Sequence, residues 1–162
     1  MKQINLEVFR NVCERCGLEF ESLGQSDDYG PIIYSNGLGS TRFLDPLVDP
    51  TWPEVSAIVD TLIASSSTRA SDSQKASLFH SALTRTVDPP EMGAFVSWEY
   101  PPCPGCGSNS RSFFGPFEPP RFQDVELEEV THNRWNRLSL KQKIEEAAKA
   151  IADRNNSDSN GY

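Results

Sequence analysis

The sequence predicts an α+β fold, since stretches with a two-residue hydrophobic period alternate with stretches of helical period. Two Cys-x-x-Cys-Gly motifs, at residues 13–17 and 103–107, lie beside the strand-like stretches and contain every cysteine of the chain. Three helix-start patterns lie between and after these motifs. We expect a single domain over residues 1–154 and a disordered tail over residues 155–162.

The first third of the chain is predicted to be mostly β-structure. Residues 4–12 form a strand, because apolar side chains recur there at every second position. The first cysteine motif ends this strand, and residues 18–22 return as the second arm of a hairpin. Residues 32–34 are a further short strand, whereas residues 41–53 are interpreted as an ordered loop because three prolines interrupt them.

A helical hairpin is predicted within an insertion that spans about residues 23–92. Thr51 with Glu54, and Ser71 with Gln74, each make the pattern of a capping box, in which two side chains satisfy backbone amides at a helix start. Apolar residues follow each start at helical spacing, and a serine-rich stretch separates the two helices.

The last third of the chain is predicted to contain three strands and one helix. Residues 92–100 form a strand that stops at two prolines, and residues 110–117 pair back with it around the second cysteine motif. Residues 122–135 are interpreted as a further strand. Ser139 with Gln142 then starts a C-terminal helix.

The cysteine motifs are predicted to bind one metal ion. The chain shows no secretory signal pattern and no apolar run of membrane-spanning length, so we expect a cytoplasmic protein whose thiols stay reduced. Gly17 and Gly107 suit turns that point backbone amides at the sulfurs, which commonly need a positive φ angle. Four thiolates leave no open coordination position, which indicates one structural Zn²⁺ ion. The predicted ligands are Cys13, Cys16, Cys103 and Cys106.

The motifs "CERCG" and "CPGCG" resemble the two knuckles of a zinc ribbon, each at the tip of a β-hairpin. The resemblance covers only the knuckles and their flanking strands. Cys16 and Cys103 are separated by 86 residues, where ribbons usually have about 15–20. Because the entropy of loop closure grows slowly with length, this spacing still permits a shared site. The resemblance implies a split four-cysteine ribbon with an inserted helical hairpin and a C-terminal helix.

Three other uses of the cysteine pairs stay open from the sequence. Each pair could be a redox dithiol, although such motifs usually begin a helix and not a Pro/Gly turn. The pairs could form disulfides, which the expected compartment disfavours. Each pair could also bind a separate ion or an iron–sulfur cluster.

The charge of the chain indicates a class of partner. The net charge is −8, which repels a phosphate backbone and attracts basic proteins, although acidity also keeps a protein soluble. We therefore expect a non-enzymatic protein that binds a basic protein. In size and charge the chain is similar to small acidic bacterial immunity proteins, which implies an inhibitor of immunity or antitoxin type with a nuclease-like partner.

A nucleic-acid-associated zinc ribbon protein is the alternative function. Residues 131–143 carry basic groups around a tryptophan, which could hold phosphates while the ring stacks on a base, or pair with the acids upstream. The candidate contact residues are Arg134, Trp135, Arg137 and Lys141. A small enzyme has less support, because neither His80 nor His132 belongs to a recognised catalytic motif.

Overall fold

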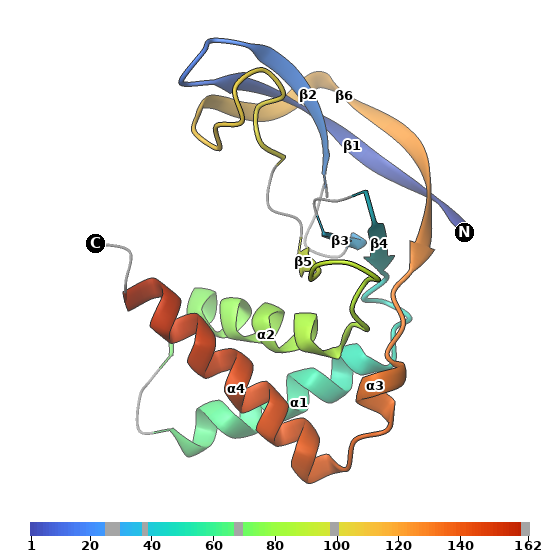
Figure 1. Ribbon diagram of the computed structural model, residues 1–162, viewed down its shortest axis with the longest axis vertical. Helices are drawn as coiled ribbons and strands as arrows, with labels where there is room; N and C mark the ends of the chain where they lie inside the picture. The colour runs from blue at the N-terminus through green and yellow to red at the C-terminus, as the bar shows by residue number, and fades with distance from the viewer. Residues whose placement is uncertain (25–29, 37–38, 67–69, 98–100, 160–162) are drawn as a thin grey trace. The chain divides into compact units, whose positions relative to one another are not determined.

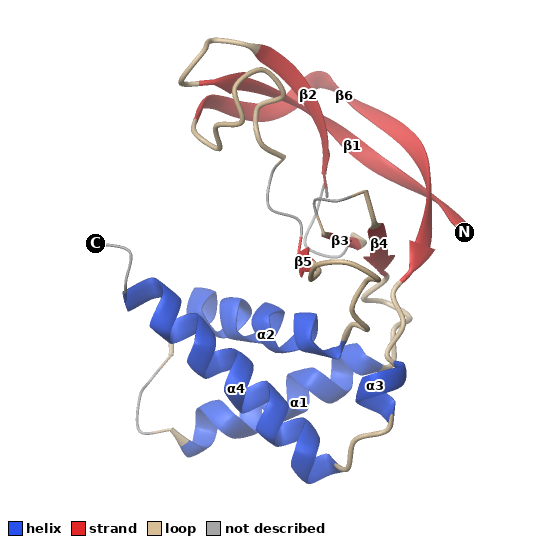
Figure 2. Ribbon diagram, viewed as in Figure 1, coloured by secondary structure: helices blue, strands red, loops and turns tan. Residues whose placement is uncertain are grey.

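The computed structural model describes residues 1–24, 30–36, 39–66, 70–97 and 101–159, with side chains through residue 153. The chain forms two compact units. The β unit consists of Met1–Leu47 and Val96–Glu129, and the helical unit consists of Val48–Phe95 and Val130–Tyr162. Figure 2 shows the strands of the described residues in the β unit and the helices in the helical unit. The α+β class is confirmed, whereas a single domain over residues 1–154 stays a prediction.

The β unit contains one mixed sheet with the strand order β2-β1-β6-β4-β3-β5. Neighbouring strands are antiparallel, except that β4 and β6 are parallel. The strands are β1 (Lys2–Cys13), β2 (Glu19–Gly24), β3 (Ile32–Ser35), β4 (Thr41–Leu44), β5 (Val96–Ser97) and β6 (Arg111–Glu129).

The long pairing of β1 with β6 is the main feature of this sheet (Figure 1). β6 replaces two strands predicted at residues 110–117 and 122–135. The pairing skips residues 117–120, two of which are prolines that cannot donate to the ladder. The predicted pairing of residues 110–117 with 92–100 is wrong among the described residues, since β6 pairs with β1 and β4, and β5 pairs with β3.

Two further differences concern short strands. The first predicted hairpin is confirmed, because β1 and β2 pair across the first cysteine motif. Residues 41–44, interpreted as loop, are instead β4, since the prolines that suggested a loop begin only at Pro46. A small apolar cluster of Leu6, Ile33 and Phe43 joins β1, β3 and β4. The partly buried side chains against it are Ile4, Leu23, Val125 and Leu127.

The helical unit consists of α1 (Thr51–Ser65), α2 (Asp72–Thr86), α3 (Asn133–Asn136) and α4 (Leu140–Ser159). α4 packs against both α1 and α2, so the predicted helical hairpin is completed by the C-terminal helix (Figure 1). The apolar side chains of α1 and α2 face inward and include Val55, Ile58, Val59 and Leu83.

The helix starts agree with the sequence in two of three places. The capping box of Ser71 and Gln74 is present, and so are the reciprocal bonds of Ser139 and Gln142. The box predicted for Thr51 and Glu54 is wrong. The Thr51 hydroxyl instead donates to the carboxylate of Asp49, and Glu54 accepts from side chains of the C-terminal segment.

The C-terminal segment departs from the sequence prediction at both ends. Residues 133–135, predicted as strand, belong to α3. α4 continues to Ser159, so residues 155–159 are helical where a disordered tail is predicted, and residues 160–162 lie outside the described residues. None of the helices in the described part of the chain is long and apolar enough to cross a membrane.

Candidate metal centre

The two cysteine motifs fold into turns of the same hydrogen-bonding pattern. The first knuckle comprises residues 13–18. In it the amide of Gly17 donates to the carbonyl of Cys13, and the amide of Cys13 donates to the carbonyl of Leu18. The second knuckle, residues 103–108, repeats both bonds from Gly107 and Cys103. Both glycines have a φ angle of 71°, which confirms the expected left-handed positions. The sequence Cys-x-x-Cys-Gly therefore dictates one local geometry twice.

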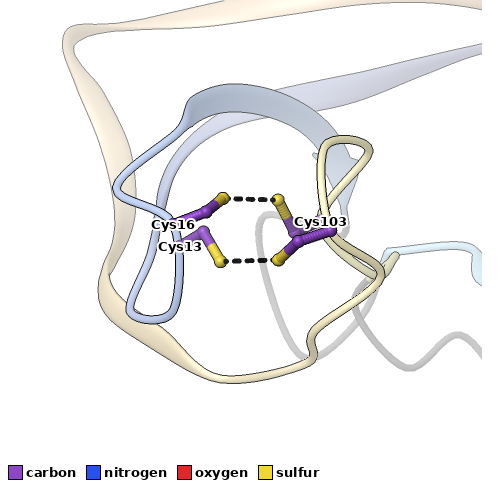
Figure 3. Close-up of side chains that lie close together, drawn as sticks. Cys13, Cys16 and Cys103 are labelled. Carbon is purple, nitrogen blue, oxygen red and sulfur yellow. Dashed lines mark hydrogen bonds between the residues drawn. The ribbon is translucent and has the colours of Figure 1, made fainter.

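The knuckles bring all four sulfur atoms together. The Sγ atoms lie within 4.8 Å of one another, and Figure 3 shows sulfurs from the two loops facing each other across a small gap. The Cys13–Cys106 and Cys16–Cys103 sulfur distances are both 3.6 Å. Such a cluster of soft ligands can bind a metal ion in one four-cysteine site, as the sequence predicts.

Burial differs among the four thiols. Cys13 and Cys103 are buried, Cys106 is partly buried, and Cys16 is exposed. Each knuckle thus places its first cysteine toward the protein and its second toward the surface. An ion at the site would lie at the rim of the β unit, reachable from solvent on the side of Cys16.

Proton binding by the clustered thiols depends on their neighbours. A backbone hydrogen bond at Cys16 outweighs the effect of burial and lowers the pKa of the Cys13 thiol to about 7. For Cys16, a backbone hydrogen bond at Leu18 also lowers the pKa, but desolvation of the sulfur by its neighbours and hydrogen bonds with the other thiols outweigh it and raise the pKa to about 12. Adjacent thiolates repel one another, so a cation is needed before all four sulfurs ionise together.

Backbone and steric contacts hold the two knuckles against each other. The amide of Glu14 donates to the carbonyl of Ser110 at 3.1 Å. A Cβ atom on Gly105 would lie only 2.9 Å from Leu18 Cδ2, so the first knuckle covers the second closely at this glycine, and a larger residue would require the end of the Leu18 side chain to move. Sequence reasoning found the ligands but missed these contacts, since nothing in a sequence indicates which loop will face which.

The basic segment proposed as a nucleic-acid contact is only partly available. Trp135 is 1% exposed, and its indole Nε1 donates to Glu54 at 2.8 Å. A ring in this position has no free face for a base, so the expected stacking role does not fit. Arg134, Arg137 and Lys141 are exposed, and Arg134 donates to the carbonyl of Arg85.

His132 serves as a buried link inside the helical unit. Nδ1 lies 3.0 Å from the carbonyl oxygen of Thr86, and Nε2 lies 3.0 Å from a carboxylate oxygen of Asp49. Because both ring nitrogens face acceptors, the geometry favours the doubly protonated ring. Burial lowers the pKa of His132, but the hydrogen bond and charge of Asp49 outweigh it and raise that pKa. The Asp49 pKa is lowered, because hydrogen bonds from His132 and Thr51 outweigh burial.

Comparisons with known proteins leave the site to be interpreted from its own geometry. No protein-family model, no curated protein and no solved structure matches the chain. The four-cysteine cluster and the distribution of charge are therefore the observations that bear on function.

Proposed function

We propose that this protein is a non-enzymatic, zinc-binding protein that acts by binding another protein. Zn²⁺ is the ion that four-thiolate sites built from Cys-x-x-Cys knuckles typically hold. A tetrahedron with Zn–S bonds of about 2.3 Å has sulfur–sulfur edges of about 3.8 Å. The two sulfur pairs at 3.6 Å are already close to such an edge.

The proposed role of the zinc is structural. Four cysteine ligands would fill the tetrahedron and leave no position for a substrate or an activated water molecule. The ion would join the β1–β2 hairpin to a loop far along the chain, which supports the resemblance to a split ribbon. His132 adds no catalytic candidate, because both of its ring nitrogens are engaged inside the helical unit.

The observation that carries the binding proposal is the charge of the unit that contains the metal site. The β unit has six Lys/Arg and thirteen Asp/Glu, a net −7, whereas the helical unit has nine and ten, a net −1. Four thiolates on one Zn²⁺ would add a further formal charge of −2. A basic protein surface would therefore be attracted to the β unit.

Strand β6 offers an ordered part of this acidic surface. Asp124, Glu126 and Glu128 alternate along the strand, so they share one face of the sheet, and all three are exposed. Asp124 is held by Gln3 and Asn5, which fix its carboxylate on the sheet. A row of exposed carboxylates, with Asp124 fixed on the sheet and Glu128 near Arg42, suits lysine and arginine side chains of a folded partner.

The partner that we propose is a basic, nuclease-like protein, which this chain would inhibit in the cytoplasm as immunity or antitoxin proteins do. An acidic cover over a basic catalytic cleft would compete with the phosphate backbone. Binding of this chain to a nucleic acid has less support, since the β unit is acidic and Trp135 is buried.

The metal proposal is tested by elemental analysis of protein that is purified in reductant. We expect about one zinc per chain in the unaltered protein and none after Cys103→Ser. Protein without any metal would contradict the zinc proposal and favour a redox dithiol or a disulfide. Iron with a visible absorption band would instead favour an iron–sulfur cluster.

The partner proposal is tested with matched charge variants. After capture from the native host and identification of the partner, association rates are compared for D124N/E126Q/E128Q in the β unit and for D60N/E91Q/E145Q in the helical unit. Both variants remove three exposed negative charges. We expect the β6 variant alone to slow association markedly at low salt. Equal rates for both variants, or micromolar binding of single-stranded RNA or DNA at physiological salt, would contradict the proposal.

A further inference from the structure

The second knuckle has strand support on one side only within the described residues. β6 follows it, but residues 101–102 before it carry no secondary structure, and β5 pairs elsewhere in the sheet. The first knuckle, by contrast, is the tip of the β1–β2 hairpin. Within the described residues, a side-chain hydrogen bond reaches this segment instead, at the carbonyl of Pro101.

Arg111, the first residue of β6, spans both ends of the second knuckle. Its Nη2 donates to the carbonyl of Pro101, two residues before Cys103, and its Nη1 donates at 2.9 Å to the carbonyl of Asn109. Its Nε donates at 2.8 Å to Oδ1 of Asn11. One guanidinium thus ties the knuckle to β1.

Asn11 anchors this arrangement on the first hairpin. The side chain is fully buried, and its Nδ2 donates to Ser22 Oγ at 2.9 Å and to the carbonyl of Phe20 at 3.4 Å. It precedes Cys13 by two residues on the same strand, so the two side chains point to the same face. The Asn11 side chain that accepts from Arg111 is therefore held in place by its bonds to β2 as well as by its position in β1.

The chemistry of the guanidinium suits this task. Its planar fork carries five donors in fixed directions, and here three of them reach three separate acceptors. A lysine ammonium has the same charge but cannot copy this fork. The Arg111 charge also lies in the unit that contains the four-thiolate cluster, which becomes formally −2 with zinc.

We infer that Arg111 and Asn11 form a clamp that sets the affinity and retention of zinc by fixing the second knuckle relative to the first. The inference rests on the proposed zinc site. The three acceptors described for Arg111 are Asn11 and two backbone carbonyls, so we treat Arg111 as a positioning residue and not as a ligand. Preorganisation of Cys103 and Cys106 reduces the ordering that the ion must impose on binding. Groups that hydrogen-bond directly to metal ligands typically change metal affinity by about 10–100-fold when altered, so we expect about 10-fold, the lower end, for a residue that positions the ligands through the backbone.

The test compares R111M with R121M in the full chain. Both variants remove one positive charge from β6, but Arg121 is exposed, pairs with Glu21 and lies outside both knuckles and the clamp. Zinc dissociation constants are measured by chelator competition, and the rate of zinc transfer to excess chelator is measured separately. We expect R111M to lose about 10-fold in affinity and to release zinc faster, with R121M close to the unaltered protein.

The outcomes separate positioning from charge and from folding. R111K keeps the charge but not the fork, and we expect it to lie near R111M. Equal affinities for R111M and R121M would overturn the inference, and so would an R111K affinity equal to that of the unaltered protein. If R111M does not fold, the affinity of R111K is compared with that of R121M, and equal values would again overturn the inference. Absence of zinc from the unaltered protein would instead contradict the proposed function.

Discussion

The helical unit and the knuckle end of the β unit bury different kinds of side chain. The helical unit has an apolar interior, with Val55, Leu83 and Trp135 among its most buried residues. The knuckle end of the β unit instead buries the amide of Asn11 and the thiols of Cys13 and Cys103. Apolar burial stabilises without a ligand, whereas buried thiols and amides stabilise only when their partners are present. The comparison therefore predicts that metal removal and core truncation will damage different units.

Loss of a zinc ligand should have the largest effect, and the damage should fall on the β unit. For Cys103→Ser we expect complete loss of bound zinc. The β unit should then lose stability, because the binding energy of a structural zinc ion, on the order of 10 kcal/mol, counts as folding energy. Amide hydrogen exchange should become fast in β1, β2 and β6 while α1 and α2 stay protected.

Ser110→Ala is the control for this variant. It keeps the backbone carbonyl that accepts from Glu14, and its side chain is exposed. It should retain both zinc and the slow exchange of β1. Native protection of β1 in zinc-free Cys103→Ser protein would show that the ion has no structural role.

Truncation of Trp135 should give the reverse pattern. Trp135→Ala removes a ring that is 1% exposed together with its hydrogen bond to Glu54. Changes of this kind typically cost about 3–5 kcal/mol. We expect a large fall in the helical circular-dichroism signal and in the melting temperature, with zinc content unchanged.

The matched control is Leu140→Ala, which shortens a side chain that is 64% exposed and should change stability little. Loss of zinc from Trp135→Ala would mean that the units are not separable.

The candidate site was more predictable from the sequence than the sheet. The knuckle geometry is local, because the position of Gly17 and Gly107 after each cysteine pair specifies the same turn in both places. The clustering of all four sulfurs also agrees with the prediction. Arg111 and Asn11 were not found, since their contact joins residues 100 positions apart and neither belongs to a known motif.

The sheet was less predictable, because strand pairing is not encoded locally. Residues 111–117 are strand as expected, but they pair with β1 and not, among the described residues, with the predicted partner at residues 92–100. Residues 110–117 and 122–135 were predicted as two separate strands, whereas β6 is one strand whose pairing with β1 is interrupted between Pro116 and Arg121. At α1, the Thr51 and Glu54 pattern matched a capping box, but Thr51 bonds to the nearby Asp49, and Glu54 bonds to side chains of the C-terminal segment.

Smaller effects should come from the glycines that close each knuckle. A Cβ atom at Gly17 or Gly107 meets nothing within 4 Å, so Gly→Ala costs only the left-handed backbone, about 1–2 kcal/mol. We expect similar destabilisation of the zinc-bound β unit for both variants, measured by urea denaturation. A much larger loss of stability at one glycine than at the other would show that the two knuckles are not equivalent.

The last prediction is that the two units respond to pH in opposite directions above neutrality. The pKa of His132 is raised in the folded state, mainly by Asp49 against the opposing effect of burial, so the charged ring contributes stability below its unfolded pKa of about 6.5. That contribution is lost as the pH rises through the folded pKa. Zinc binding instead strengthens as the pH rises, because the thiols must lose their protons. We would measure the unfolding free energy of the helical unit between about pH 6 and pH 9 for the unaltered protein and for His132→Gln. The difference between them should shrink as the pH rises, and a constant difference would show that His132 is neutral in the folded state.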